Sequence, residues 1–188
     1  MTYGALGLER LIREGNRGQG DGLSIVPEPD LPKLKGDGQA AVDLHLGRWF
    51  LVLKQTHQTH FDFRAEAASK AGGKEYFVPF EGEFVIHPGR FVLAATLEWI
   101  HMPASKSGLV LGRSTVGRRG LVIETAPGIQ PGFNGCLTLE MANIGEIPIT
   151  CYPGMRICQL FVEDVKEPGI PRVSRHSCQL KPALGGSV

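Results

Sequence analysis

Five Pro-Gly dipeptides punctuate the chain from residue 88 onward. They begin at Pro88, Pro127, Pro131, Pro153 and Pro168. Each joins a residue with a fixed φ to one that tolerates positive φ, so each predicts a tight turn. Gly (25) and Pro (13) are also more abundant than a helical bundle of 188 residues would contain. The chain is therefore expected to consist mainly of short strands joined by turns.

The apolar segments between these turns have the length and spacing of strands. Ten are expected, at 40–46, 49–54, 75–80, 83–86, 91–100, 108–112, 121–125, 136–143, 147–152 and 156–165. This spacing predicts an all-β sandwich, jelly roll or related barrel. Before it, residues 6–14 place Leu8, Leu11 and Ile12 on one face of a helix, and a short strand fits 23–26. Residues 64–74 are expected to form a loop or short helix.

Size and charge exclude several classes of protein. The length suits one domain over residues 1–188. A net charge of +1 argues against nucleic acid as a partner. No apolar run of ~18 residues is present to cross a membrane, and the N-terminus lacks the pattern of a signal peptide. The expected location is the cytoplasm, where the four cysteines would be thiols.

The densest polar cluster is GRSTVGRRG at 112–120, directly after an apolar strand. Guanidinium groups, hydroxyls and backbone N–H groups that glycine leaves approachable suit a phosphate chain. A solvated turn is the alternative. The glycines and hydroxyls together favour phosphate binding.

A carboxylate interrupts the apolar segment CLTLEMAN at 136–143. Strand alternation puts Thr138 and Glu140 on one face and Leu137, Leu139 and Met141 on the other. Glu140 is then either a surface residue of an edge strand or a site residue. In a half-buried position its pKa would rise, which suits a general base.

Other familiar motifs are absent or weak. His57 and His60 are spaced i, i+3, which in a strand points them to opposite faces, so loop surface is the expected setting. The chain lacks the H-x-E and P-C-x-x-C patterns of zinc nucleobase deaminases. It also lacks a P-loop, a G-x-S-x-G elbow and a dinucleotide-binding glycine fingerprint.

The order of segments over residues 8–182 resembles the dCTP deaminase branch of the dCTP deaminase/dUTPase superfamily. The resemblance is carried by AAVDLHLG (40–47), 82–105, GRSTVGRRGLV (112–122), 128–164 and the tail motif Gln179-x-x-Pro. It implies a β-clip, or distorted jelly roll, that assembles as a homotrimer with active sites shared between subunits. It also implies that the tail, residues 168–188, closes over the site. A ligand or a neighbouring subunit is expected to order this tail.

The resemblance assigns roles residue by residue. Glu140 falls on the general base, and Ser114 and Arg118 fall on groups beside the reacting base. Arg118 would be presented to a neighbouring subunit. The residues implied to bind substrate are Arg113, Ser114, Thr115, Arg118, Gln130, Thr138, Leu139 and Gln179. No residue is implied to bind a resident metal: the family uses no zinc, and Mg²⁺ arrives with the nucleotide triphosphate.

The implied reaction is hydrolysis of dCTP to dUTP and ammonia, with dTTP as a candidate feedback inhibitor. Two alternatives stay open: a dUTPase or bifunctional enzyme that also releases pyrophosphate, and a nucleotide-binding regulator without turnover. Gln130 stands where the family has an aspartate, and an amide cannot act as a base. This counts against the dUTPase step, while retention of Glu140 counts against a regulator.

Overall fold

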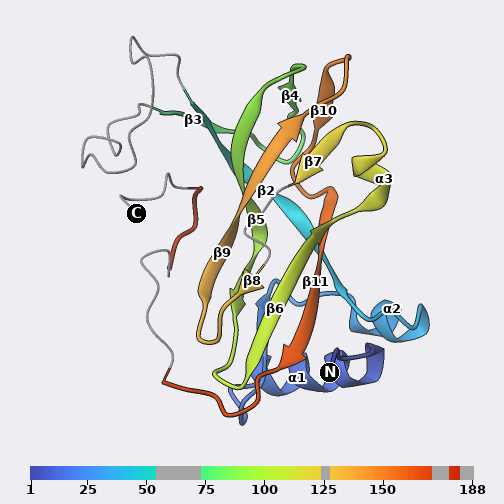
Figure 1. Cartoon of the computed structure of the whole chain (residues 1–188), viewed down its shortest axis with the longest axis vertical. Helices are drawn as coiled ribbons and strands as arrows, with labels where there is room; N and C mark the ends of the chain where they lie inside the picture. Colours follow the sequence, from blue (N-terminus) through green and yellow to red (C-terminus); the bar gives the residue numbers. More distant parts are fainter. Residues whose placement is uncertain (54–72, 124–127, 171–177, 183–188) are drawn as a thin grey trace.

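The computed structural model describes residues 1–53, 73–123, 128–170 and 178–182. Two helices, α1 (Ala5–Asn16) and α2 (Leu31–Gly36), lie together at one end of the molecule (Figure 1). A third, the single turn α3 (Ser114–Gly117), lies toward the other end. No helix in the described ranges has the length and apolar character needed to cross a membrane. The histidines His57 and His60 and most of residues 64–74 lie outside the described ranges.

The strands confirm the expected all-β class. They are β1 (Ser24–Val26), β2 (Val42–Leu53), β3 (Gly73–Phe77), β4 (Phe84–Ile86), β5 (Phe91–His101), β6 (Lys106–Gly112), β7 (Leu121–Ile123), β8 (Gly128–Ile129), β9 (Asn134–Asn143), β10 (Ile149–Cys151) and β11 (Arg156–Asp164). A nine-stranded sheet has the order β7-β9-β5-β2-β11-β6-β8, with β1 paired to β5 and β3 to β2. A separate ribbon joins β4 to β10. Every pairing between these strands is antiparallel.

One long strand replaces two expected ones. Residues 40–46 and 49–54 were predicted as separate strands, but β2 runs through both. Its register against β5 shifts between Leu46 and Phe50. A Cβ on Gly47 would lie 2.7 Å from the carbonyl oxygen of Ala95, so glycine lets β5 approach at the irregularity. The glycine that suggested a turn instead permits close approach inside one strand.

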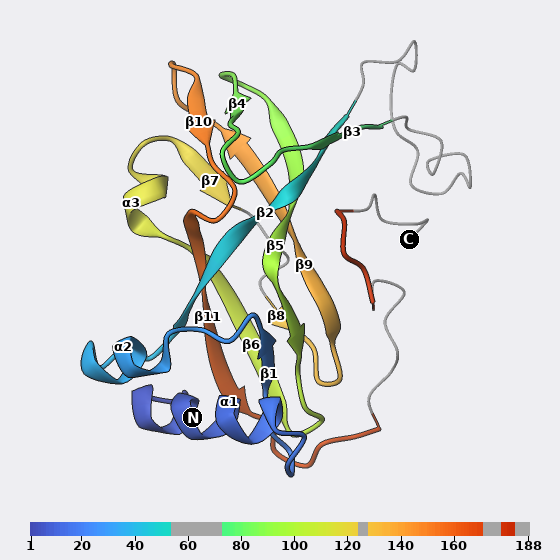
Figure 2. The same ribbon diagram turned by 180° about the vertical axis from the view of Figure 1, so that it is seen from behind.

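The helical end contains the second departure from expectation. Residues 31–36 lie outside every helix and strand expected from the sequence, yet they form α2, whose first turn is capped by the Asp30 side chain at 3.0 Å from Lys33 N. Helix α1 confirms the expected amphipathic helix, with Leu8, Leu11 and Ile12 buried. These residues join the core, which the curled sheet encloses with Phe50, Leu44, Leu139 and Leu160 among its members. Figure 2 shows the two helices below the sheet from the opposite side.

Asn143, at the end of β9, ties together the other end of the molecule. It is fully buried. Its Nδ2 donates to the carbonyl oxygens of Ile86 (2.8 Å) and Ile147 (2.9 Å), and its Oδ1 accepts from Gly145 N at 2.9 Å. One amide therefore joins β9, β4 and the loop that leads to β10.

Replacing Asn143 with Ala should destabilise the chain. The variant removes the partner of one buried carbonyl oxygen and of a carbonyl oxygen and an N–H group that are half-buried, so we expect a loss of about 2–4 kcal/mol in the free energy of unfolding. Denaturant titration followed by circular dichroism measures it. The neighbouring Ile144→Ala is the control, because Ile144 is 72% exposed and should change stability by no more than ~0.5 kcal/mol. Equal stability of the two variants would contradict the structural role of Asn143.

Candidate active site

The two edges of β9 differ in how they are paired. One edge pairs with β5 along most of the strand, from Asn134 to Ala142. On the other edge, β7 pairs only with residues 141–143. At the opposite end of this edge, the tail residues Cys178 and Gln179 bond to Asn134 and Cys136. Within the described ranges, no strand pairs with residues 137–140 on this side.

Thr138 presents its backbone at this open stretch. The N–H of Cys136 points away from β5, because it donates to Gln179 O at 2.9 Å. The next N–H, of Leu137, points toward β5 and donates to Thr96 Oγ1 at 2.9 Å. Backbone groups alternate along an antiparallel strand, so the N–H and C=O of Thr138 point outward together. One residue thus offers a donor and an acceptor side by side.

The side chains of β9 follow the expected alternation. Leu137, Leu139 and Met141 are buried, whereas Thr138 and Glu140 are half-buried on the opposite face. Glu140 lies directly opposite Leu93 of β5, which lies opposite Leu51 of β2. A carboxylate therefore sits at the end of an apolar row, beside the outward-pointing backbone of Thr138.

The predicted phosphate-binding segment forms the turn of α3. Arg113 precedes the turn, and the side chains of Ser114, Thr115 and Arg118 are exposed. The turn leads into β7, which pairs with the end of β9. Gly120 closes it with φ +89°, and its carbonyl oxygen accepts from Ile144 N at 2.9 Å. The segment is thereby fixed to the same strand that carries Glu140.

Arg113 is held by a carboxylate that lies 70 positions earlier in the chain. Its Nη1 donates to Asp43 Oδ1 on β2. The same carboxylate accepts from Gln159 Nε2 at 3.0 Å and from Arg156 Nη1 at 3.2 Å. Burial raises the pKa of Asp43, but hydrogen bonds and the charge of Arg113 outweigh it, so the pKa lies below its ordinary value of 3.8. Asp43 is therefore a carboxylate that fixes Arg113 through one nitrogen of a guanidinium that carries five N–H donors.

The candidate catalytic groups make no direct polar contact with one another in the part of the chain that the structure describes. No hydrogen bond or ion pair in the described ranges links Glu140 to Ser114 or Arg118. Gln130 is exposed in the turn between β8 and β9, where its carbonyl oxygen accepts from Phe133 N at 3.1 Å. Gln179 lies at the edge of β9, where its carbonyl oxygen accepts from the N–H of Cys136, two residues before Thr138. The carboxylate on the β9 edge and the arginine-hydroxyl turn of α3 are therefore two groups that no direct polar contact joins in the described ranges.

The buried cysteines do not act as nucleophiles at neutral pH. Burial raises the pKa of Cys136 and Cys151 to about 11 and that of Cys158 to about 12, with Glu98 adding to the rise at Cys136 and Cys158. These thiols stay protonated, and only thiolates attack readily. In the parts of the chain that the structure describes, no three His, Cys, Asp or Glu side chains gather as a metal site.

The sequence interpretation missed Asp43 as a part of this site. Asp43 alternates with apolar residues in VDLHL at 42–46, which is the same signal that singled out Glu140 in CLTLEMAN. The pattern marks a carboxylate on a strand. The alternation does not reveal which residue pairs with Asp43, because Arg113 lies in the connection between β6 and α3, far from β2 in the sequence.

A scan against protein families matches residues 24–165 to the dCTP deaminase-like family. Relatives include the dUMP-forming dCTP deaminase of Methanobrevibacter smithii, 40% identical over 76% of this chain and 77% of that protein. Another is the dCTP deaminase of Thermomicrobium roseum, 34% identical over 79% of this chain and 75% of that protein. This chain belongs to the dCTP deaminase-like family.

A solved structure agrees on the fold. The 2'-deoxycytidine 5'-triphosphate deaminase of Agrobacterium tumefaciens superposes with a TM-score of 0.60 at 18% identity. The match covers 86% of this chain and 47% of that one, so this chain spans about half of its length. This likeness confirms the architecture that the family resemblance implied.

The Asp43 pair should give a defined pH dependence to stability. Because the folded pKa of Asp43 is lowered, its carboxylate stabilises the fold above its ordinary pKa of 3.8, and this is lost as the pH falls through the folded value. We expect Asp43→Asn to cost about 1–2 kcal/mol at pH 7. The difference in the free energy of unfolding between Asp43→Asn and the unmodified chain should become smaller below pH 4.

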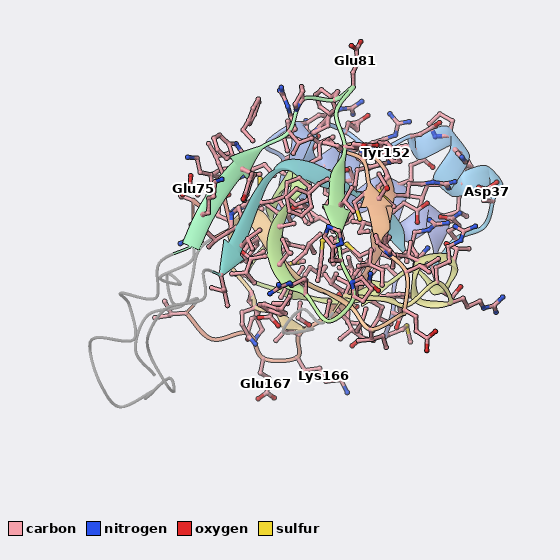
Figure 3. All side chains as sticks on the ribbon, turned by 90° about the horizontal axis from the view of Figure 1, so that it is seen from above. Asp37, Glu75, Glu81, Tyr152, Lys166 and Glu167 are labelled. Carbon is pink, nitrogen blue, oxygen red and sulfur yellow. The ribbon has the colours of Figure 1, made fainter. Side chains whose placement is uncertain are left out.

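Denaturant titrations at pH 7, 5 and 3 measure this difference. Asp37→Asn is the matched control, because Asp37 is exposed at the end of α2 and points into solvent (Figure 3). A difference for Asp43→Asn that stays constant down to pH 3 would rule out the charge of Asp43 as its cause.

Proposed function

We propose that this chain hydrolyses dCTP to dUTP and ammonia. Membership of the dCTP deaminase-like family supports the reaction class. The observation that carries the assignment to residues is the open stretch of β9, where a backbone donor and acceptor stand beside a half-buried carboxylate. A pyrimidine ring edge bears both hydrogen-bond donors and acceptors, so Thr138 and Leu139 are the proposed readers of the base.

Glu140 is the proposed general base. Its carboxylate takes a proton from water as the oxygen attacks C4 of the cytosine ring. The tetrahedral intermediate then collapses: the C4–N4 bond breaks, Glu140 returns the proton to the departing nitrogen to give ammonia, and the proton left on the attacking oxygen moves to N3 as the C4 carbonyl forms. Ser114 and Arg118 orient the water and balance the developing charge. The carboxylate does this work without zinc.

The α3 turn is the proposed seat of the phosphates. Arg113, Ser114 and Thr115 provide guanidinium and hydroxyl donors, and Gln130 is proposed to contact the sugar. Mg²⁺ enters as part of the bound nucleotide triphosphate. Gln179 lies on the tail, which we propose closes over this substrate. We also propose dTTP as an inhibitor, because it carries the same triphosphate and a pyrimidine.

Glu140 makes no direct polar contact with Ser114 or Arg118 in the described residues, and this supports a shared site. We propose a homotrimer in which one subunit presents β9 and its neighbour presents the α3 turn. Each subunit then forms a single domain over residues 1–188 that is incomplete as a catalyst. The four unpaired cysteines suit a reducing compartment, so we propose a cytoplasmic location.

A second candidate is formation of dUMP with release of pyrophosphate. Its support is that relatives at 40% identity, from Methanobrevibacter smithii and Mycolicibacterium smegmatis, are dUMP-forming dCTP deaminases. The amide of Gln130 argues against it, because it supplies no basic group for a second water. Incubation with dCTP and Mg²⁺, assayed separately for ammonia and pyrophosphate, decides between the two products.

Replacing Glu140 with Gln should remove basicity while keeping shape. We expect kcat for ammonia release to fall by roughly 10²–10⁴-fold, with nucleotide binding retained. Glu146→Gln is the control, because Glu146 is an exposed glutamate just beyond the same strand. Ammonia release by Glu140→Gln at the rate of the control would exclude Glu140 as the base.

Mixing two inactive variants tests the shared site. If Glu140 and Arg118 serve one site from different subunits, trimers that mix Glu140→Gln with Arg118→Ala regain intact sites. Random mixing at equal amounts should restore about a quarter of the activity of the unmodified chain. Activity is measured after the two proteins are unfolded and refolded together. No recovery, in mixtures shown to contain hybrid trimers, would mean that both residues serve the site from one subunit.

A further inference from the structure

Lys181, in the described part of the tail, is held by two different groups. Its Nζ lies 2.9 Å from Glu75 Oε2 on β3 and 3.9 Å from the ring centroid of Trp49 on β2. Trp49 pairs directly with Phe77 across the strands, as Leu51 does with Glu75. Figure 3 labels Glu75 on the ribbon of β3. The ammonium therefore contacts a carboxylate and an aromatic face that neighbouring strands present together.

The aromatic surface under Lys181 is rigidly built. The rings of Trp49 and Phe77 are 4.9 Å apart and tilted by 57°. The guanidinium of Arg48 stacks on Phe77 at 4.3 Å and on Phe80 at 4.8 Å. A cation over an indole face is attracted by the ring quadrupole, and indole is the best aromatic acceptor for it. Trp49 is thus a fixed receptor for the lysine.

The same tail segment is bonded to β9 at its other end. Cys178 N donates to Asn134 O at 2.6 Å, and Cys136 N donates to Gln179 O at 2.9 Å. Gly135 permits this approach, since a Cβ there would lie 3.2 Å from Gln179 N. Trp99 also fixes the junction, with Nε1 donating to Asn134 Oδ1 at 2.6 Å. Both views of the ribbon show the segment beside β9 (Figures 1 and 2).

These contacts lie on the face of the sheet that carries the candidate base. Trp49 and Leu51 point to one face of β2, and Leu51 lies in a row with Leu93 and Glu140. A segment attached at β9 and again at β2 and β3 therefore borders this face. Gln179 is then held at Cys136, the outward-pointing residue that precedes Thr138 along the open edge.

We propose that Lys181 is a positioning residue: its clamp between Glu75 and Trp49 anchors the tail so that Gln179 stays at the open edge of β9. Lys181 touches no reacting atom and acts through Gln179. The expected effect of Lys181 on dCTP kinetics rests on the proposed function, whereas the attachment of the tail by Lys181 does not.

The clamp needs both of its contacts to be effective. The side chains of Lys181 and Glu75 are 46% and 52% exposed, so their ion pair alone is weak and screened by salt. The contact with Trp49 adds to it at the same ammonium. Together they should change the fraction of attached tail by roughly three- to tenfold. Lys181→Arg should keep the anchor, because arginine both pairs with carboxylates and stacks on aromatic rings.

Amide hydrogen exchange at Cys136 measures the anchor directly, since this N–H is bonded to the tail. In the full-length protein without nucleotide, Lys181→Ala should accelerate that exchange about three- to tenfold. Lys181→Arg should leave it near the unmodified rate. Lys74→Ala is the matched control, because Lys74 stacks on Tyr76 at 4.6 Å, one position from Glu75 on the same strand. Unchanged exchange at Cys136 in Lys181→Ala would overturn the anchor.

Steady-state kinetics with dCTP and Mg²⁺ test the positioning role. We expect Lys181→Ala to raise KM about three- to tenfold with kcat within twofold, and Lys181→Arg to restore KM. A normal KM alongside accelerated exchange would reduce Lys181 to a structural contact and overturn the role. If the unmodified chain releases no ammonia from dCTP, the proposed function fails. The exchange measurement still decides the anchor in that case.

Discussion

The pairing of β9 with β5 is the constraint on which the candidate site depends. It buries Leu139 and Met141 and fixes the strand along one edge. On the edge of β9 away from β5, the N–H and C=O groups of alternate residues therefore point outward. Thr138, with its backbone donor and acceptor, and Glu140, with its carboxylate, are two positions apart on the same strand. No loop therefore has to become ordered to bring these groups together. Sites on regular strands hold geometry better than sites on loops.

An unpaired strand edge is normally a liability, because it is a template for another strand. Here the open stretch is bounded by β7 at one end and by the tail at the other. Both are short, so an incoming strand would meet occupied positions after a few residues. The same two boundaries therefore protect the edge and define its size.

Local patterns predicted the strands, the amphipathic helix and the face on which Glu140 lies, because these depend on the alternation of neighbouring residues. They failed where packing overrides local signals. Gly47 suggested a turn, but close approach of β5 makes it part of β2. The signals for α2 were present as an Asp30 cap and a proline in the first turn. In the sequence, these helix signals were outweighed by the many Gly and Pro residues around them, which indicate loop. No local pattern could join Asp43 to Arg113 or Lys181 to Trp49, because each pair is a product of the finished fold.

These distant pairs share a physical logic. Arg and Lys side chains have many rotamers, and each loses roughly 2 kcal/mol of entropy when it is fixed. In this chain Asp43 fixes Arg113 and Glu75 fixes Lys181 before any ligand arrives. The folding of the sheet supplies that ordering, so it does not have to be supplied by binding. The guanidinium of Arg113 is a planar fork with five N–H groups, and Asp43 accepts from one of its nitrogens. Asp43 therefore fixes the orientation of this guanidinium, and the order that strand β2 imposes on Asp43 is passed to the residue that precedes the α3 turn.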